Sequence, residues 1–70
     1  MRYAIVIEAA GANYSAYVLD LPGCVATGAT VEEAEQAIGA AIELHLEGLR
    51  ADSLPIPPAS RRVDYVEVAA

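Results

Sequence analysis

The sequence predicts an α+β fold with the element order β-β-β-α-β, in which one helix packs on one face of a sheet. Two strand-like runs rich in apolar residues, 2–8 and 14–19, flank a turn-forming segment at residues 9–13, as in a β-hairpin. Residues 31–51 instead repeat apolar side chains at helical spacing. The chain has 70 residues, which is the size of one small domain, so we assign residues 1–70 to a single domain.

The first predicted strand, residues 2–8, carries apolar side chains on both faces. Tyr3, Ile5 and Ile7 alternate with Ala4 and Val6 along this strand. A strand that is apolar on both faces is typical of the interior of a sheet, so we expect it to be the central strand.

A tight turn follows the second strand at Leu21-Pro22-Gly23-Cys24. Pro22 fixes its φ at a value that suits a turn, and Gly23 takes the positive φ that a side chain resists. The turn leads into a third short strand at residues 24–27, which Gly28 closes.

Thr30 is placed to cap the helix predicted at residues 31–51, and Glu33 can return the hydrogen bond as a capping box. One stripe of this helix is apolar and the opposite stripe is polar. The apolar stripe comprises Val31, Ala34, Ile38, Ala41, Ile42, His45 and Leu49. The polar stripe comprises Glu32, Gln36, Glu43, Glu47 and Arg50.

Three prolines make residues 54–60 an extended connector, and residues 62–68 then predict a last strand. One helix covers only one face of such a sheet, so the other face or an exposed edge requires a cover. We expect a second copy of the chain to supply it, in a dimer or a tetramer.

The composition favours a protein partner over nucleic acid. Ten acidic residues and four basic ones give a formal charge of −6, and lysine is absent. Nucleic-acid binding depends on basic side chains that neutralise phosphates, so direct binding is not expected, whereas an acidic surface suits a basic protein. No apolar run approaches a membrane span and no leader pattern is present, so we expect no membrane contact and a cytoplasmic protein.

No arrangement of reactive side chains predicts an enzyme, a cofactor or a metal site. His45 lies within the apolar stripe and Cys24 is the only cysteine, so we expect both to be packed side chains, with no disulfide and no zinc site. One alternative is a two-metal nuclease, because the element order resembles the first half of the ribonuclease H fold. Glu8, Glu47 and Asp64 are its candidate ligands, but the first ends its strand and the second lies opposite the apolar stripe.

With these elements placed, the chain resembles the HicB family, the antitoxins of HicA–HicB toxin–antitoxin pairs. The resemblance runs from residue 3 to residue 58 and rests on an ordered set of short motifs. These are Ala16-Tyr17, Leu19, Asp20-Leu21-Pro22-Gly23-Cys24, Gly28, Thr30, Glu32-Glu33-Ala34, Ala41-Ile42, Leu44-His45-Leu46, Leu49 and Pro55-Ile56-Pro57. The chain ends after the last predicted strand, so we expect a short form without the C-terminal DNA-binding domain that many members carry.

The resemblance implies a degraded ribonuclease H-like domain that is not an enzyme and that neutralises HicA, a small basic ribonuclease toxin, by masking its RNA-cleaving site. We expect acidic residues to contact that partner: Asp20, Glu32, Glu33, Glu43 and Glu47. An alternative is an orphan HicB-like binding or scaffold module whose partner is different or lost.

Overall fold

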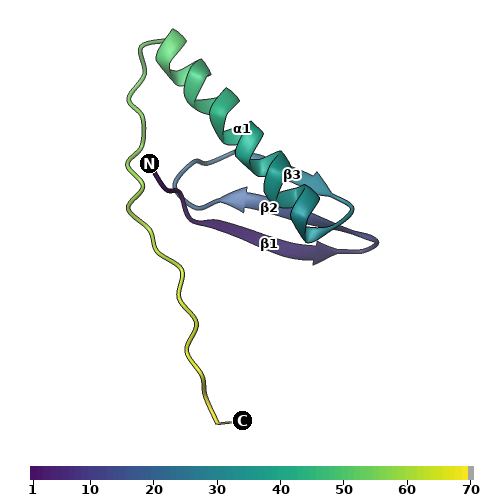
Figure 1. The fold of residues 1–70 in the computed structure, drawn as a ribbon. Helices are drawn as coiled ribbons and strands as arrows, with labels where there is room; N and C mark the ends of the chain where they lie inside the picture. Colours follow the sequence, from purple (N-terminus) through teal and green to yellow (C-terminus); the bar gives the residue numbers. More distant parts are fainter. Residues whose placement is uncertain (70) are drawn as a thin grey trace.

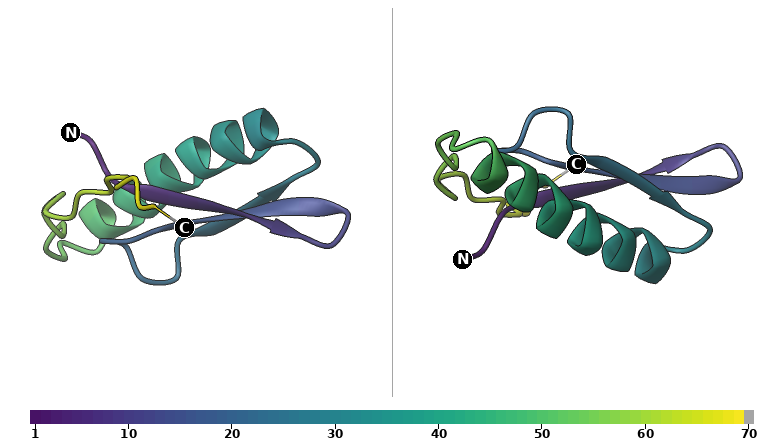
Figure 2. Two further views of the ribbon diagram at one scale, coloured as in Figure 1. Left: turned by 90° about the horizontal axis from the view of Figure 1, so that it is seen from below. Right: turned by 90° about the horizontal axis from the view of Figure 1, so that it is seen from above.

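The computed structural model describes residues 1–69 and has two layers, a three-stranded antiparallel sheet and one helix (Figure 1). The strands are β1 (Ile5–Ala10), β2 (Asn13–Val18) and β3 (Val25–Gly28), in the spatial order β1-β2-β3. Helix α1 (Val31–Ala51) crosses one face of this sheet (Figure 2). The α+β class, the three leading strands and the helix are confirmed.

Glycine provides the backbone freedom at both turns of the sheet. Gly11 has a φ of 65° in the two-residue turn between β1 and β2. Gly23 has a φ of 81°, and the Cys24 amide donates to the Leu21 carbonyl over 3.1 Å. With Pro22 before the glycine this is a type II turn, as the sequence predicts.

The expected capping interactions begin α1. The Thr30 hydroxyl accepts a 3.1 Å hydrogen bond from the Glu33 amide. The Glu33 carboxylate in turn accepts one of 2.9 Å from the amide of Ala29, the residue before the cap. The first bond satisfies an amide that the first turn of a helix would otherwise leave unpaired, and the second holds the residue before the cap against the helix start. Together they fix where α1 starts.

The core lies between α1 and one face of the sheet. Its buried members come from β2, the turn and α1: Ala16, Val18, Leu21, Cys24, Ala34 and Ile38. The predicted helical stripe is confirmed at Ala34, Ile38, Ala41 and Ile42, which lie in or against this core. His45 and Leu49 are half-buried, and the first member, Val31, is exposed. Leu46, which the predicted stripe omitted, packs against this core. The core is therefore small and one-sided.

Gly28, at the end of β3, allows the backbone of α1 to approach the sheet closely. A Cβ atom at this position would lie 2.8 Å from the carbonyl carbon of Glu33, and it would also overlap the backbone nitrogen of Ala34. Real Cβ atoms do not approach backbone atoms this closely, so any side chain here would push the helix away from the strand.

Two expectations about the sheet are wrong. β1 is an edge strand and β2 is central, because β1 pairs with β2 alone. Residues 62–68 form no strand within the described chain; they belong to an extended tail, residues 62–69, that projects beyond the sheet on the side away from α1 (Figure 1). The physical reason is that a strand requires a paired neighbour, and the connector directs the tail past the start of β1 rather than along it.

The projecting tail makes the chain longer than a compact domain of its size. Its radius of gyration is 13.7 Å and its principal extents are 48 × 27 × 16 Å. A compact chain of this length has a radius of gyration of about 11 Å. All residues of the tail are exposed.

Replacement of Gly28 by alanine should lower the free energy of unfolding by about 1–3 kcal/mol, because the new methyl group overlaps the helix backbone. Chemical denaturation followed by circular dichroism measures this change. Gly48→Ala is the matched control, since a Cβ atom added there, within α1, would meet no neighbouring atom within 4 Å. That control should stabilise the helix by up to about 1 kcal/mol. Equal effects of the two substitutions would contradict the close approach.

Candidate interaction surfaces

An acidic face runs along the exposed side of α1. Glu32, Gln36, Glu43 and Glu47 are separated by four, seven and four residues, which are the spacings of one helical face. This face is about 22 Å long from its first to its last glutamate at 1.5 Å per residue. All four side chains are exposed, and Glu43 and Glu47 border an open hollow together with Leu44, whose exposed fraction is 69%.

The five acidic residues expected to contact a partner do not form one cluster. Glu32, Glu43 and Glu47 share the acidic face, whereas Glu33 is exposed but also serves the helix cap. Asp20 lies in the loop after β2, with a side chain only 7% exposed. Of the five expected residues, those on the acidic face are therefore the acidic side chains that a partner can reach.

Asp20 anchors the C-terminal segment to the sheet. Its carboxylate accepts hydrogen bonds of 3.0 Å from the amides of both Ser60 and Arg61. The Arg61 guanidinium lies 3.6 Å from the same carboxylate and donates to the Leu19 carbonyl over 2.8 Å. Because one carboxylate holds two consecutive amides, it sets the direction in which the tail leaves the domain.

A second anchor lies upstream in the connector. The Tyr3 hydroxyl donates a 2.6 Å hydrogen bond to the Pro57 carbonyl, and Ile56 and Pro57 are half-buried. Sequence reasoning identified the connector but not these anchors. The proline-rich composition of the connector predicts an extended chain, but it does not indicate which part of the domain the connector contacts.

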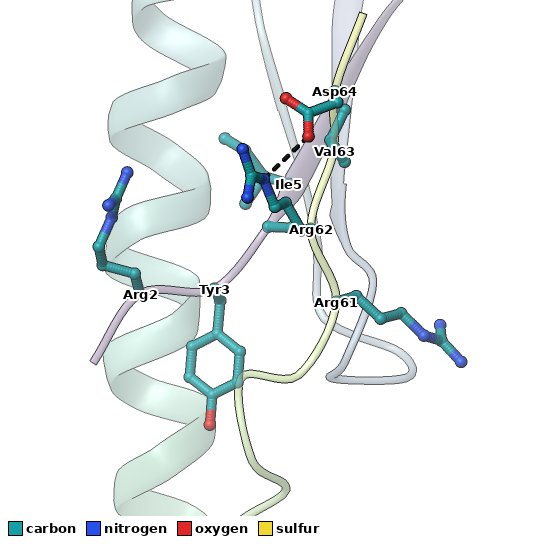
Figure 3. Close-up of a pocket in the computed structure, with 8 residues that line it drawn as sticks. Arg2, Tyr3, Ile5, Arg61, Arg62, Val63 and Asp64 are labelled. Carbon is teal, nitrogen blue, oxygen red and sulfur yellow. Dashed lines mark ion pairs between the residues drawn. The ribbon is translucent and has the colours of Figure 1, made fainter.

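A basic hollow separates the start of β1 from the start of the tail (Figure 3). Arg2, Tyr3 and Ile5 line one side, and residues 61–64 line the other. Three of the chain's four arginines lie here, at positions 2, 61 and 62. Arg62 forms a 2.9 Å ion pair with Asp64. Three of the four arginines are thus gathered beside the sheet edge, although Arg61 and Arg62 are paired with Asp20 and Asp64.

The sheet face opposite α1, here called the open face, carries an apolar row. The register pairs Val6 with Tyr17 and Tyr17 with Val25, so the three side chains lie side by side across the strands. The exposed fraction is 36% for Tyr17 and 66% for Val25. No described element covers this row.

The reactive side chains are packed or dispersed. Cys24 is buried, and this burial raises the pKa of its thiol. His45 is half-buried on the core side of α1. Among residues 1–69, no three His, Cys, Asp or Glu side chains are grouped closely enough to hold a metal ion, so Glu8, Glu47 and Asp64 are not brought together. Within the same residues, α1 lacks the apolar length that a membrane-spanning helix requires.

These surfaces and this fold define a small two-layer α+β domain with the acidic and apolar faces typical of protein-binding domains. The model of the HicB-like antitoxins of bacterial toxin–antitoxin systems matches residues 3–69, and the chain belongs to this family.

Two curated proteins are similar to the chain in sequence. The chain is 41% identical over 57 residues to a UPF0150 protein of Synechocystis, a match that covers 80% of this chain and 72% of the relative. It is 35% identical over 66 residues to an uncharacterized 14.9 kDa protein from the rep–hol intergenic region of Haemophilus phage HP1. That match covers 94% of this chain but spans only 50% of the phage protein. No solved structure matches the chain.

Replacement of Asp20 by asparagine should loosen the tail, because the neutral amide offers a weaker acceptor to the Ser60 and Arg61 amides. Hydrogen exchange at these two amides should accelerate about tenfold, the change that corresponds to the loss of about 1.4 kcal/mol. Asp64→Asn is the control, since Asp64 is an exposed carboxylate that pairs with Arg62 alone. Unchanged exchange in Asp20→Asn would show that the anchor does not hold the segment.

Cys24 should react slowly with a thiol reagent in the folded protein at neutral pH and rapidly in denaturant. Burial raises the pKa of the native thiol, so it remains protonated at a pH where an unfolded thiol, with a pKa of about 8.5, begins to ionise. The free energy of unfolding should therefore fall as the pH rises above that value. The Cys24→Ala variant should lack this component. A native reaction as fast as the denatured one would contradict the burial.

Proposed function

We propose that this chain is an antitoxin-type interaction protein that binds a HicA-like ribonuclease toxin and masks its RNA-cleaving site. The observation that carries the proposal is the family match over residues 3–69. An antitoxin acts by contact with its toxin, so the proposal assigns the chain a binding role and no catalytic step. It also places the protein in the cytoplasm, where a toxin directed at cellular RNA acts.

The charge of the chain supports a basic partner. The formal charge is −6, and the glutamates of the acidic face are exposed without an ion pair among the described residues. A surface that cleaves RNA must attract phosphates and is therefore basic. An acidic helix that docks on such a surface competes with RNA for the same positive charges, and opposite fields also accelerate and orient the encounter.

The proposed contact residues are Glu32, Glu33, Glu43 and Glu47, with Asp20 at the margin of the surface. Glu43 and Glu47 lie one turn apart beside the exposed Leu44. This combination of two carboxylates and an apolar side chain suits a protein interface, in which an apolar centre is bordered by charges. Asp20 already holds Ser60 and Arg61, so its contribution to a partner would be smaller than that of the helical glutamates.

The direct test is affinity purification of the tagged full-length protein from its native cell, with the bound proteins identified by mass. A small, basic, stoichiometric partner is expected. That partner alone should cleave RNA, and addition of this protein should stop the cleavage. Recovery of the chain alone, while the neighbouring gene is expressed, would favour the orphan module and reject the antitoxin role.

Reversal of charge at Glu43 or Glu47, as Glu43→Lys or Glu47→Lys, should slow association with the basic toxin about 3–10-fold at low salt and weaken the salt dependence. Stopped-flow or surface-based kinetics measures the association rate constant. Glu8→Lys makes the same charge change on an exposed residue of β1 and should have a smaller effect. Equal effects at the three positions would show that the association rate depends on the net charge of the protein, and would reject a specific role for the acidic face.

A further inference from the structure

We propose that the tail, residues 62–69, is a β-strand donor that pairs with the free edge of β1 in a second copy of this chain, while the open faces of the two copies pack together. This inference specifies the self-association that the sequence predicts, and it is independent of toxin binding. It assigns one occupant, the tail of a second copy, to both the sheet edge and the basic hollow.

The composition of the tail is that of a strand without a partner. Val63, Tyr65, Val66 and Val68 are β-branched or aromatic, the residue types enriched in strands. Their exposed fractions are 45%, 97%, 83% and 75%. The backbone of this segment is already extended and forms no ladder within the described residues. Large apolar side chains that are exposed along an extended segment are typical of a segment that binds to another surface.

The edge of β1 offers the matching backbone groups. The Leu19 amide donates to the Ala4 carbonyl over 3.1 Å, and the register places Val6 opposite Tyr17. In an antiparallel pair every second residue directs both its amide and its carbonyl toward the neighbouring strand. Ile5 and Ile7 therefore direct their amides and carbonyls away from β2, toward the free edge. These groups form a template for one additional strand.

The two faces of β1 lead to the same conclusion. Its side chains are apolar toward α1, at Ile5 and Ile7, and Val6 is apolar on the open face. Such a strand is expected inside a sheet, yet β1 is at the edge. An added strand on β1, together with a second open face against Val6, Tyr17 and Val25, would give this strand the central position that its sequence predicts.

Charge complementarity favours a copy of this chain as the occupant. The hollow beside the start of β1 is lined by three arginines and by Asp64. Arg61 pairs with Asp20 and Arg62 pairs with Asp64, so Arg2 is the arginine of the hollow that has no ion pair among the described residues. The tail beyond Arg62 carries Asp64 and Glu67 and no basic residue, so a partner's tail brings carboxylates toward Arg2. In a symmetric dimer each copy both provides and receives such a tail.

The length and direction of the tail suit this arrangement. The tail leaves its anchor at Asp20 and projects past the open face (Figure 1). The eight extended residues of the tail span about 26 Å, and two packed sheets lie about 10 Å apart. About three residues therefore cross to the partner's sheet, and about five remain to pair with its β1 edge.

The test compares the full-length protein with the Val66→Pro and Val66→Thr variants. Val66 is exposed in the single chain, so neither change should disturb the fold of the monomer. Proline removes an amide and cannot enter a ladder, whereas threonine keeps the amide and the β-branched shape. Analytical ultracentrifugation should show a dimer for the unmodified protein and for Val66→Thr, and a dissociation constant raised on the order of 100-fold for Val66→Pro.

Hydrogen exchange at the amides of Ile5 and Ile7 then locates the pairing. In the dimer these amides should be protected, and in Val66→Pro they should exchange at least about tenfold faster. A monomer at micromolar concentration would overturn self-association and this inference together. A dimer that Val66→Pro leaves intact, or one with unprotected Ile5 and Ile7 amides, would overturn the tail exchange alone. Neither result bears on toxin capture, which the affinity purification tests separately.

Discussion

The close contact between the start of α1 and Gly28 is the constraint on which the rest of the structure depends. Because no side chain separates β3 from the helix backbone, α1 lies directly on the sheet, and Ala34 and Ile38 close the core over Ala16 and Val18. The capping bonds of Thr30 and Glu33 set the helix start at this same place. A single helix so fixed covers one face, and the architecture leaves the opposite face open.

The local elements could be predicted because their signals are short-range. The positive φ of Gly23 follows from a Pro-Gly pair, and the cap follows from a threonine three residues before a glutamate. The core stripe follows from helical periodicity, although Val31, the first residue of the helix, is exposed. These features depend on neighbours within a few residues, which the sequence displays directly.

The arrangement of the last segment could not be predicted in the same way. Residues 62–68 have the composition of a strand, but pairing depends on where the connector docks. That position is determined by the contacts of Tyr3 with Pro57 and of Asp20 with Ser60 and Arg61, which join residues at least 40 positions apart. The position of β1 was predicted wrongly for a related reason. Its two apolar faces indicate a strand with neighbours on both sides, but the single chain provides a neighbouring strand on one side only. For the candidate site, the sequence identified the exposed glutamates of α1. It did not indicate that Asp20, a half-buried residue, anchors the C-terminal segment.

The anchor at Asp20 also bears on how copies of the chain assemble. A chain that carries both a strand donor and an acceptor edge can join its copies in two ways, as a closed pair or as an open-ended fibre in which each tail reaches a further molecule. A freely rotating tail permits both outcomes. Two consecutive amides held on one carboxylate restrict the direction in which the tail leaves the domain. In the proposed dimer the anchor would therefore favour the closed pair over a fibre, because it limits the arrangements that the tail can adopt.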